Sequence, residues 1–224
     1  MCHKTLPENY IYHDTIDLKN NKKHFWIVMG LGLVLCAVLI AVGWCIVRLP
    51  YIYDFIEQEE NLGISIAAIA TVVVGSVLYI IGHEAVHGLY MYLFCRAKIK
   101  YGFVGWAAYA GSSAYYDKMH YVVISLAPVT IWGIVFAILN VFFHEGIWFW
   151  VIWILQIANI SGASGDFFCA FKVLTYPKDI LVCDSGMDMK VYRKMTDEEA
   201  AKAANLNSEN ETESTEENGE AKFD

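Results

Sequence analysis

Four long apolar stretches constrain the fold of this 224-residue chain more than any other feature of its sequence. They cover residues 25–47, 62–95, 119–143 and 146–174. An α-helix of about 20 residues, rising about 1.5 Å per residue, crosses a hydrocarbon core about 30 Å thick. The stretches therefore predict an all-α polytopic membrane protein with four transmembrane helices, the third of them kinked at Pro128.

Lysine and arginine residues near the ends of these stretches predict the orientation of the chain. Basic residues cluster before the first stretch, between the second and third, and after the fourth, whereas the opposite side offers only Arg48 beside several acidic residues. Cytoplasmic loops carry an excess of Lys and Arg. The sequence therefore predicts a multi-pass protein of the cell membrane with both termini cytoplasmic, and residues 1–24 form its N-terminal cytoplasmic segment.

Shorter segments on the predicted cytoplasmic side have a different composition. Residues 101–116 are rich in Gly, Ser, Ala and Tyr, which predicts a small β-hairpin or a re-entrant loop. Residues 180–192 predict a second hairpin, with Asp184-Ser185-Gly186 as its turn. The six cysteines contain no CxxC pair, and most of them are predicted to be reduced packing residues.

The net charge of −8 is concentrated at the end of the chain. Residues 196–224 hold 10 of the 24 acidic residues and 2 of the 16 basic ones, so the remainder of the chain is neutral. The few apolar residues in this segment predict a disordered acidic C-terminal tail. A neutral body without a basic face argues against a nucleic-acid partner. Residues 25–195 are then predicted to form one membrane-embedded domain.

The second apolar stretch contains His83-Glu84-Ala85-Val86-His87, the HExxH pattern. On a helix, residues four apart share a face, so both imidazoles can bind one Zn²⁺ at about 2.0–2.1 Å, with Glu84 beside the metal-bound water. Two histidines and a glutamate inside an apolar span are costly to bury and usually mark a functional site. The alternative is a chance pattern at a helix end that reaches the aqueous interface.

Hydrolysis at zinc requires a third protein ligand and an open coordination position. Asp166 is the candidate, because it follows Ile147 of the fourth stretch by 19 residues, as His83 follows Ile64 of the second. Both helices are predicted to run from outside to inside, so the two side chains reach a similar depth in the membrane. Pairing with Lys172 and capping of a broken helix are the alternatives for Asp166.

Asn159 precedes Asp166 by about two helical turns. Two roles are open to it: a hydrogen bond to the oxyanion or the substrate, and an interhelical hydrogen bond. The small residues 162–164 let helices approach closely and leave room for a metal and water, or they serve ordinary helix packing.

These residues resemble the site-2 protease superfamily of intramembrane zinc metalloproteases, whose core carries HExxH on one membrane helix and an Asp ligand on a later one. The chain is also similar to a family of small bacterial membrane proteins named as zincin peptidases. The resemblance rests on residues 83–87, Ser125-Leu126-Ala127-Pro128, residues 159–166 and residues 176–186. It implies a three-helix core, with zinc held by His83, His87 and Asp166, and Glu84 as catalytic base. The glycine beside Asp166 precedes it here, whereas site-2 proteases usually place a glycine after the Asp.

The predicted function is that of an intramembrane zinc metalloprotease that cleaves membrane-embedded or membrane-proximal segments near the cytoplasmic face. Its predicted partners are a membrane protein or peptide substrate and the lipid bilayer, and no oligomeric state is predicted. By analogy, the segment 101–116 offers a strand edge that captures the substrate in extended form. Two alternatives stand beside this function: a non-proteolytic membrane protein that holds a structural or transported metal, and a scaffold whose acidic tail recruits partners.

Overall fold

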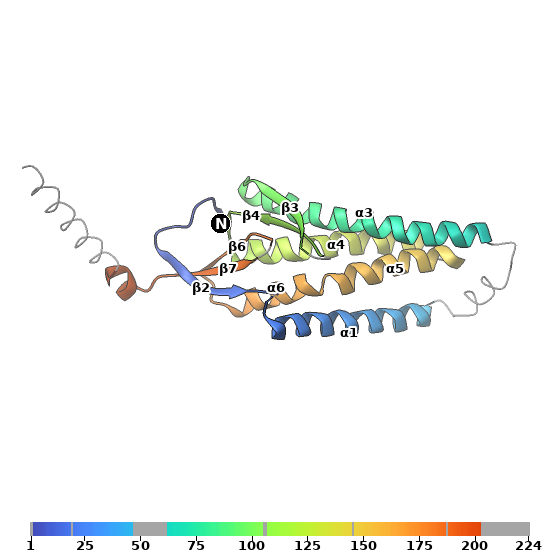
Figure 1. The fold of residues 1–224 in the computed structure, drawn as a ribbon, viewed down its shortest axis with the longest axis horizontal. Coiled ribbons are helices and arrows are strands. Elements are labelled where there is room, and N and C mark those ends of the chain that lie inside the picture. Colours follow the sequence, from blue (N-terminus) through green and yellow to red (C-terminus); the bar gives the residue numbers. More distant parts are fainter. Residues whose placement is uncertain are drawn as a thin grey trace, which may run out of the picture.

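The structure, a computed structural model, describes residues 2–18, 20–46, 62–104, 107–144, 146–186 and 188–202. The longer helices in this part of the chain are α1 (Lys22–Ile46), α3 (Leu62–Cys95), α4 (Lys118–Phe142), α5 (Gly146–Gly162) and α6 (Ser164–Thr175). Counting α5 and α6 as one, four are long and apolar enough to cross a membrane. The four predicted spans are thus confirmed as helices. Figure 1 shows them side by side, with the larger sheet at one end of the bundle.

The α4 helix packs against α3, α5 and α6, and α3 also packs against α5. The α1 helix packs against α5 and α6 from outside this group. A side chain at Gly43 of α1 would meet the indole of Trp153 on α5, whose Nε1–H donates to the Leu39 carbonyl at 3.0 Å. Small residues let membrane helices approach closely, so Gly43 permits this contact.

The fourth predicted span consists of two helices. The α5 helix ends at Gly162 and α6 begins at Ser164, with Ala163 between them at φ −77° and ψ 12°. The sequence predicts the interruption at Asp166, but the helix breaks three residues earlier, among the small residues. Asp166 therefore lies in the first turn of α6, where a carboxylate interacts favourably with the helix dipole.

Five strands form an antiparallel sheet at the end of the bundle where the N-terminus lies (Figure 1). In order across the sheet they are β1 (Cys2–His3), β5 (Tyr115–Asp117), β6 (Ile180–Asp184), β7 (Met189–Lys194) and β2 (Tyr10–Ile16). The β6–β7 pair confirms the hairpin predicted at residues 180–192. The strands β1 and β2 are not predicted by the sequence analysis, although the aromatic and β-branched residues of β2 favour a strand.

A hydrogen bond and a disulfide are among the contacts that attach the N-terminal segment to the helical part of the chain. Asp14 of β2 accepts a hydrogen bond from the hydroxyl of Tyr176, the residue that follows α6, at 2.5 Å, and this hydrogen bond lowers the pKa of Asp14. Cys2 of β1 forms a disulfide with Cys95, the last residue of α3. The remaining cysteines are free, as predicted for most of the six: Cys36, Cys45, Cys169 and Cys183.

The strands β3 (Ile99–Val104) and β4 (Ala107–Ser112) form the other predicted hairpin. The hairpin lies along α3 (Figure 1), and both of its strands contact that helix. Tyr101 of β3 lies against Gly88 of α3, and Gly111 of β4 lies against the turn Ser185–Gly186. The hairpin is therefore held between α3 and the five-stranded sheet.

We expect Gly111→Ala to destabilise the fold more than Gly88→Ala. A Cβ at Gly111 would meet the backbone of Ser185, which cannot move without displacing the turn. A Cβ at Gly88 would meet the hydroxyl end of the Tyr101 side chain, which can turn away. Overpacking against a fixed neighbour costs about 1–3 kcal/mol. Thermal unfolding of both variants in the same detergent measures the difference, and equal melting temperatures would contradict this account of the hairpin.

Residues 197–202 form a short helix, whereas the sequence predicts disorder from residue 196 onward. Thr196 and Glu199 begin this helix as a capping box: the Glu199 N–H donates to Thr196 Oγ1 at 3.3 Å, and the Thr196 N–H donates to Glu199 Oε2 at 3.0 Å. Arg193 of β7 donates to both carboxylate oxygens of Glu199, at 2.8 and 2.6 Å. The rest of the predicted tail, residues 203–224, lies outside the described residues.

Candidate metal centre

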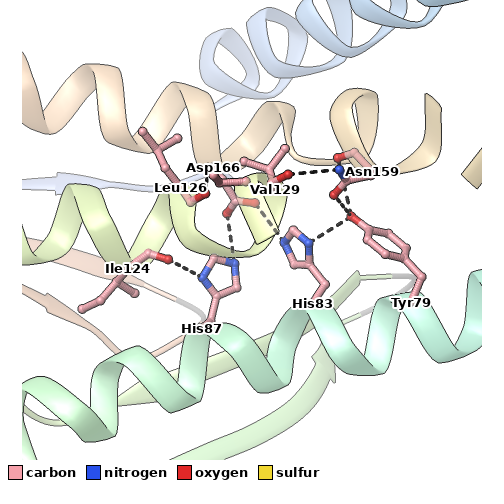
Figure 2. Close-up of polar contacts among 9 residues, drawn as sticks. Tyr79, His83, His87, Ile124, Leu126, Val129, Asn159 and Asp166 are labelled. Carbon is pink, nitrogen blue, oxygen red and sulfur yellow. Dashed lines mark hydrogen bonds and ion pairs between the residues drawn. The ribbon is translucent and has the colours of Figure 1, made fainter. Parts of the chain in front are cut away.

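The histidines of the HExxH pattern face the aspartate of α6. His83 Nε2 lies 3.1 Å from one carboxylate oxygen of Asp166, and His87 Nε2 lies 3.4 Å from the other (Figure 2). One ligand atom from each of the three residues lies within 4.8 Å of the other two. The structure thus brings together the three residues predicted as metal ligands, from helices about 80 residues apart in the sequence.

This arrangement fits a zinc ion. Ligands about 2.0–2.1 Å from a tetrahedral zinc lie about 3.4 Å from one another. His83 Nε2 lies 3.1 Å from one oxygen of Asp166 and His87 Nε2 lies 3.4 Å from the other, and one ligand atom from each residue lies within 4.8 Å of the other two. Two imidazoles and one carboxylate are also a donor set that catalytic zinc sites use, with the fourth position open. The side chains of His83 and His87 are 10% and 11% exposed, and the Asp166 side chain is 25% exposed. The carboxylate side therefore faces the more accessible part of the site.

His87 is held from behind by a backbone carbonyl of α4. Its Nδ1 lies 2.9 Å from the Ile124 carbonyl oxygen (Figure 2). A carbonyl can only accept, so Nδ1 carries a hydrogen, and Nε2, on the side of Asp166, is the nitrogen that would bind a metal. Pro128, four residues after Ile124, has no N–H to donate to that carbonyl. The proline predicted as a kink therefore also leaves the Ile124 carbonyl available for His87.

His83 contacts a second group of polar side chains. Its Nδ1 lies 2.9 Å from the Tyr79 hydroxyl, which in turn lies 3.1 Å from Asn159 Oδ1. The Asn159 amide nitrogen donates to the Val129 carbonyl at 3.1 Å (Figure 2). Asn159 is fully buried, at 0% exposure. Of the two roles open to Asn159 from the sequence, these contacts correspond to the interhelical hydrogen bond.

Glu84 follows His83 on α3 and is half-buried. Its carboxyl interacts with the backbone amide of Ala110 on β4. It is not among the three side chains whose ligand atoms converge. Glu84 therefore lies beside the ligand residues on α3 and close to β4, and it is not one of the three converging ligands.

Two groups near this site are not among the site residues predicted from the sequence. Asp184, at the end of β6, accepts hydrogen bonds from the Tyr121 hydroxyl at 2.9 Å and the Gly186 N–H at 2.8 Å. Burial raises the pKa of Asp184, which is close enough to His87 to interact with it electrostatically. Tyr79 is the other group, and its signal in the sequence was a hydroxyl one helical turn before His83 in an otherwise apolar stretch.

Residues 75–181 match the model of a protein family described as "Putative zincin peptidase". No curated protein and no solved structure matches the chain. The matched range contains the HExxH residues, Asp166 and the Tyr79–Asn159 contacts. The match supports a zincin-like family for this chain, and with it a metallopeptidase that uses zinc.

Proposed function

We propose that this protein is an intramembrane zinc metalloprotease that hydrolyses peptide bonds in membrane-embedded or membrane-proximal segments near the cytoplasmic face. One observation carries the proposal. His83, His87 and Asp166 converge, with Glu84 beside them, within helices long enough and apolar enough to cross a membrane. A catalytic group at that position acts on a peptide bond at membrane depth. A site-2 protease-like core of α3, α4 and the α5–α6 pair is part of this proposal.

Metal binding and proton transfer are assigned to different residues. His83, His87 and Asp166 would hold zinc, which when bound polarises the peptide carbonyl and lowers the pKa of water. Glu84 takes a proton from the attacking water and delivers it to the leaving amine, as a general base and then a general acid. Its position beside the ligand residues, and not among them, suits a group that exchanges protons with the water and does not bind the metal.

Substrate binding requires an unwound segment, because a helix in lipid hides its amide carbonyls in its own hydrogen bonds. The β4 strand lies against α3, and the Ala110 amide of β4 reaches Glu84. An extended peptide that paired with the edge of β4 would run past Glu84 and present its carbonyls to the ligand residues. The hairpin predicted from residues 101–116 thus supplies the strand edge of the proposed substrate site.

Both termini are proposed to lie in the cytoplasm, and labelling of single cysteines tests this orientation. The free cysteines are first replaced by serine, and Glu57→Cys and Glu211→Cys are then made separately. We expect an impermeant maleimide to label position 57 in intact cells and position 211 only after permeabilisation, because the Lys and Arg residues favour the cytoplasm. Protection at position 57 with labelling at position 211 would reverse the orientation.

The activity is tested on purified protein in liposomes, with zinc content and cleavage of a single-span substrate measured on the same preparation. The proposal expects one zinc per chain and cleavage that a chelator abolishes and added zinc restores. Zinc binding without cleavage of any of a panel of unwinding-prone spans would instead support a protein that holds the metal for structure or transport.

A further inference from the structure

We propose that Tyr79 and Asn159 are positioning residues for zinc. They fix the His83 imidazole with its hydrogen on Nδ1 and its Nε2 lone pair toward the metal. This inference rests on the proposed zinc site and adds two residues to it, neither of which contacts the metal. Four groups on α3, α4 and α5 form the chain of hydrogen bonds that carries it: His83, Tyr79, Asn159 and the Val129 carbonyl (Figure 2).

The orientation of the Asn159 amide is the first step. One end of the amide lies 3.1 Å from the Val129 carbonyl oxygen. That oxygen has no hydrogen to give, so the NH₂ end of the amide must face it. The amide oxygen of Asn159 therefore faces Tyr79, and it can only accept.

The hydroxyl of Tyr79 is the second step. It has one hydrogen, and both of its contacts on Asn159 are acceptors: Oδ1 at 3.1 Å and the backbone carbonyl at 3.5 Å. The Tyr79 hydroxyl therefore donates its hydrogen to Asn159. The Tyr79 oxygen remains to accept from His83 Nδ1 at 2.9 Å, so Nδ1 must carry a hydrogen.

The third step connects the hydrogen on His83 Nδ1 to zinc binding. An imidazole that binds zinc through Nε2 keeps its one hydrogen on Nδ1. In a buried apolar setting that N–H needs an acceptor, because a buried donor without a partner has lost its hydrogen bond to water and gained none in the protein. Tyr79 is buried and packed against Trp132 and Phe136. We call the chain of hydrogen bonds from His83 through Tyr79 and Asn159 to the Val129 carbonyl the relay. It gives the His83 Nδ1–H an acceptor, as the Ile124 carbonyl does for the Nδ1–H of His87.

Tyr79→Phe tests the relay, because phenylalanine keeps the ring that packs on Trp132 and Phe136 and removes only the oxygen. We expect zinc affinity, measured by competition with a chelating dye, to fall about 10- to 100-fold, the usual cost of losing a partner behind a metal-binding histidine. Tyr92→Phe on the same helix is the matched control, because Tyr92 is 52% exposed. It should bind zinc as the wild type does.

Two further measurements separate positioning from general loosening of the fold. In zinc-loaded, ¹⁵N-labelled protein, NMR should show the proton on His83 Nδ1 protected from exchange with water. Tyr79→Phe should abolish that protection. Asn159→Leu should lower zinc affinity little further in the Tyr79→Phe background, because the two residues act through one chain of hydrogen bonds.

Several outcomes would overturn the relay. Equal zinc affinity of Tyr79→Phe and wild type, unchanged protection of the His83 proton, or fully additive effects of the two substitutions would each do so. His83→Ala distinguishes these failures from failure of the zinc site. If His83→Ala binds zinc as tightly as wild type, the proposed site itself is wrong. If only that variant loses zinc, the site stands and the relay falls.

Discussion

Glu84→Gln should lower peptide hydrolysis by roughly 10²-fold or more while zinc stays bound. The loss is the usual scale for a missing general base, because an amide cannot take a proton from water or pass one to the leaving amine. Glutamine keeps the size and the helix propensity of glutamate. Glu84 is also outside the group of converging ligand atoms, so zinc binding does not depend on it directly. Cleavage rate and zinc content are measured on the same liposome preparation.

A second Glu→Gln substitution controls for the loss of one carboxylate. Glu199→Gln removes a charge from the exposed pair with Arg193, outside the four long apolar helices. It should leave both hydrolysis and zinc content at the wild-type level. Full activity of Glu84→Gln would refute its role as a base. A modest change in zinc affinity of Glu84→Gln would not, because a nearby carboxylate also tunes the charge around the metal.

The shared face of His83 and His87 and the similar depth of His83 and Asp166 follow from regular helix geometry, which is why the sequence could predict them. The rise of about 1.5 Å per residue and the shared face of residues four apart apply to any straight helix. Counting residues from the ends of two apolar stretches was therefore enough to place His83 and Asp166 at one depth. The structure puts their nearest ligand atoms 3.1 Å apart.

The partners behind the ligands depend on contacts between helices that no local pattern specifies. Pro128 is recognisable in the sequence as a kink, but the carbonyl that it leaves without a helical donor belongs to Ile124. Only the packing of α3 on α4 brings His87 to that carbonyl. The contact of Tyr79 with Asn159 likewise joins residues 80 positions apart. Depth in the membrane is readable from sequence, whereas rotation of one helix against another is not.

In the five-stranded sheet, too, pairing between distant segments could not be predicted from the sequence. Hairpins such as β3–β4 and β6–β7 join neighbouring segments, and their turn residues predict them. The strand β2 pairs with β7, which lies more than 170 residues later in the chain. Its pattern of aromatic and β-branched residues favours a strand but carries no information on a partner so distant. The N-terminal strands were missed for this reason.

His83→Ala, His87→Ala and Asp166→Ala should each reduce zinc binding by more than the 10- to 100-fold expected for a partner behind a ligand. A site with three protein ligands loses a direct bond to the metal in each variant. Zinc content after dialysis against a weak chelator should fall to the background of a metal-free preparation. Hydrolysis should fall with it, in contrast to Glu84→Gln, which keeps its zinc.

Matched substitutions of neighbouring residues test whether this loss is specific to the ligands. Asp184→Asn changes a partly buried carboxylate close to the site, and His120→Ala removes an imidazole paired with Asp117. Neither residue belongs to the group of converging ligand atoms, so both variants should keep wild-type zinc content. If Asp184→Asn loses zinc as fully as Asp166→Ala, the assignment of Asp166 as the one carboxylate that the zinc site requires is wrong. If Asp166→Ala binds zinc as wild type does, the metal centre lies elsewhere and the proposed hydrolytic site fails with it.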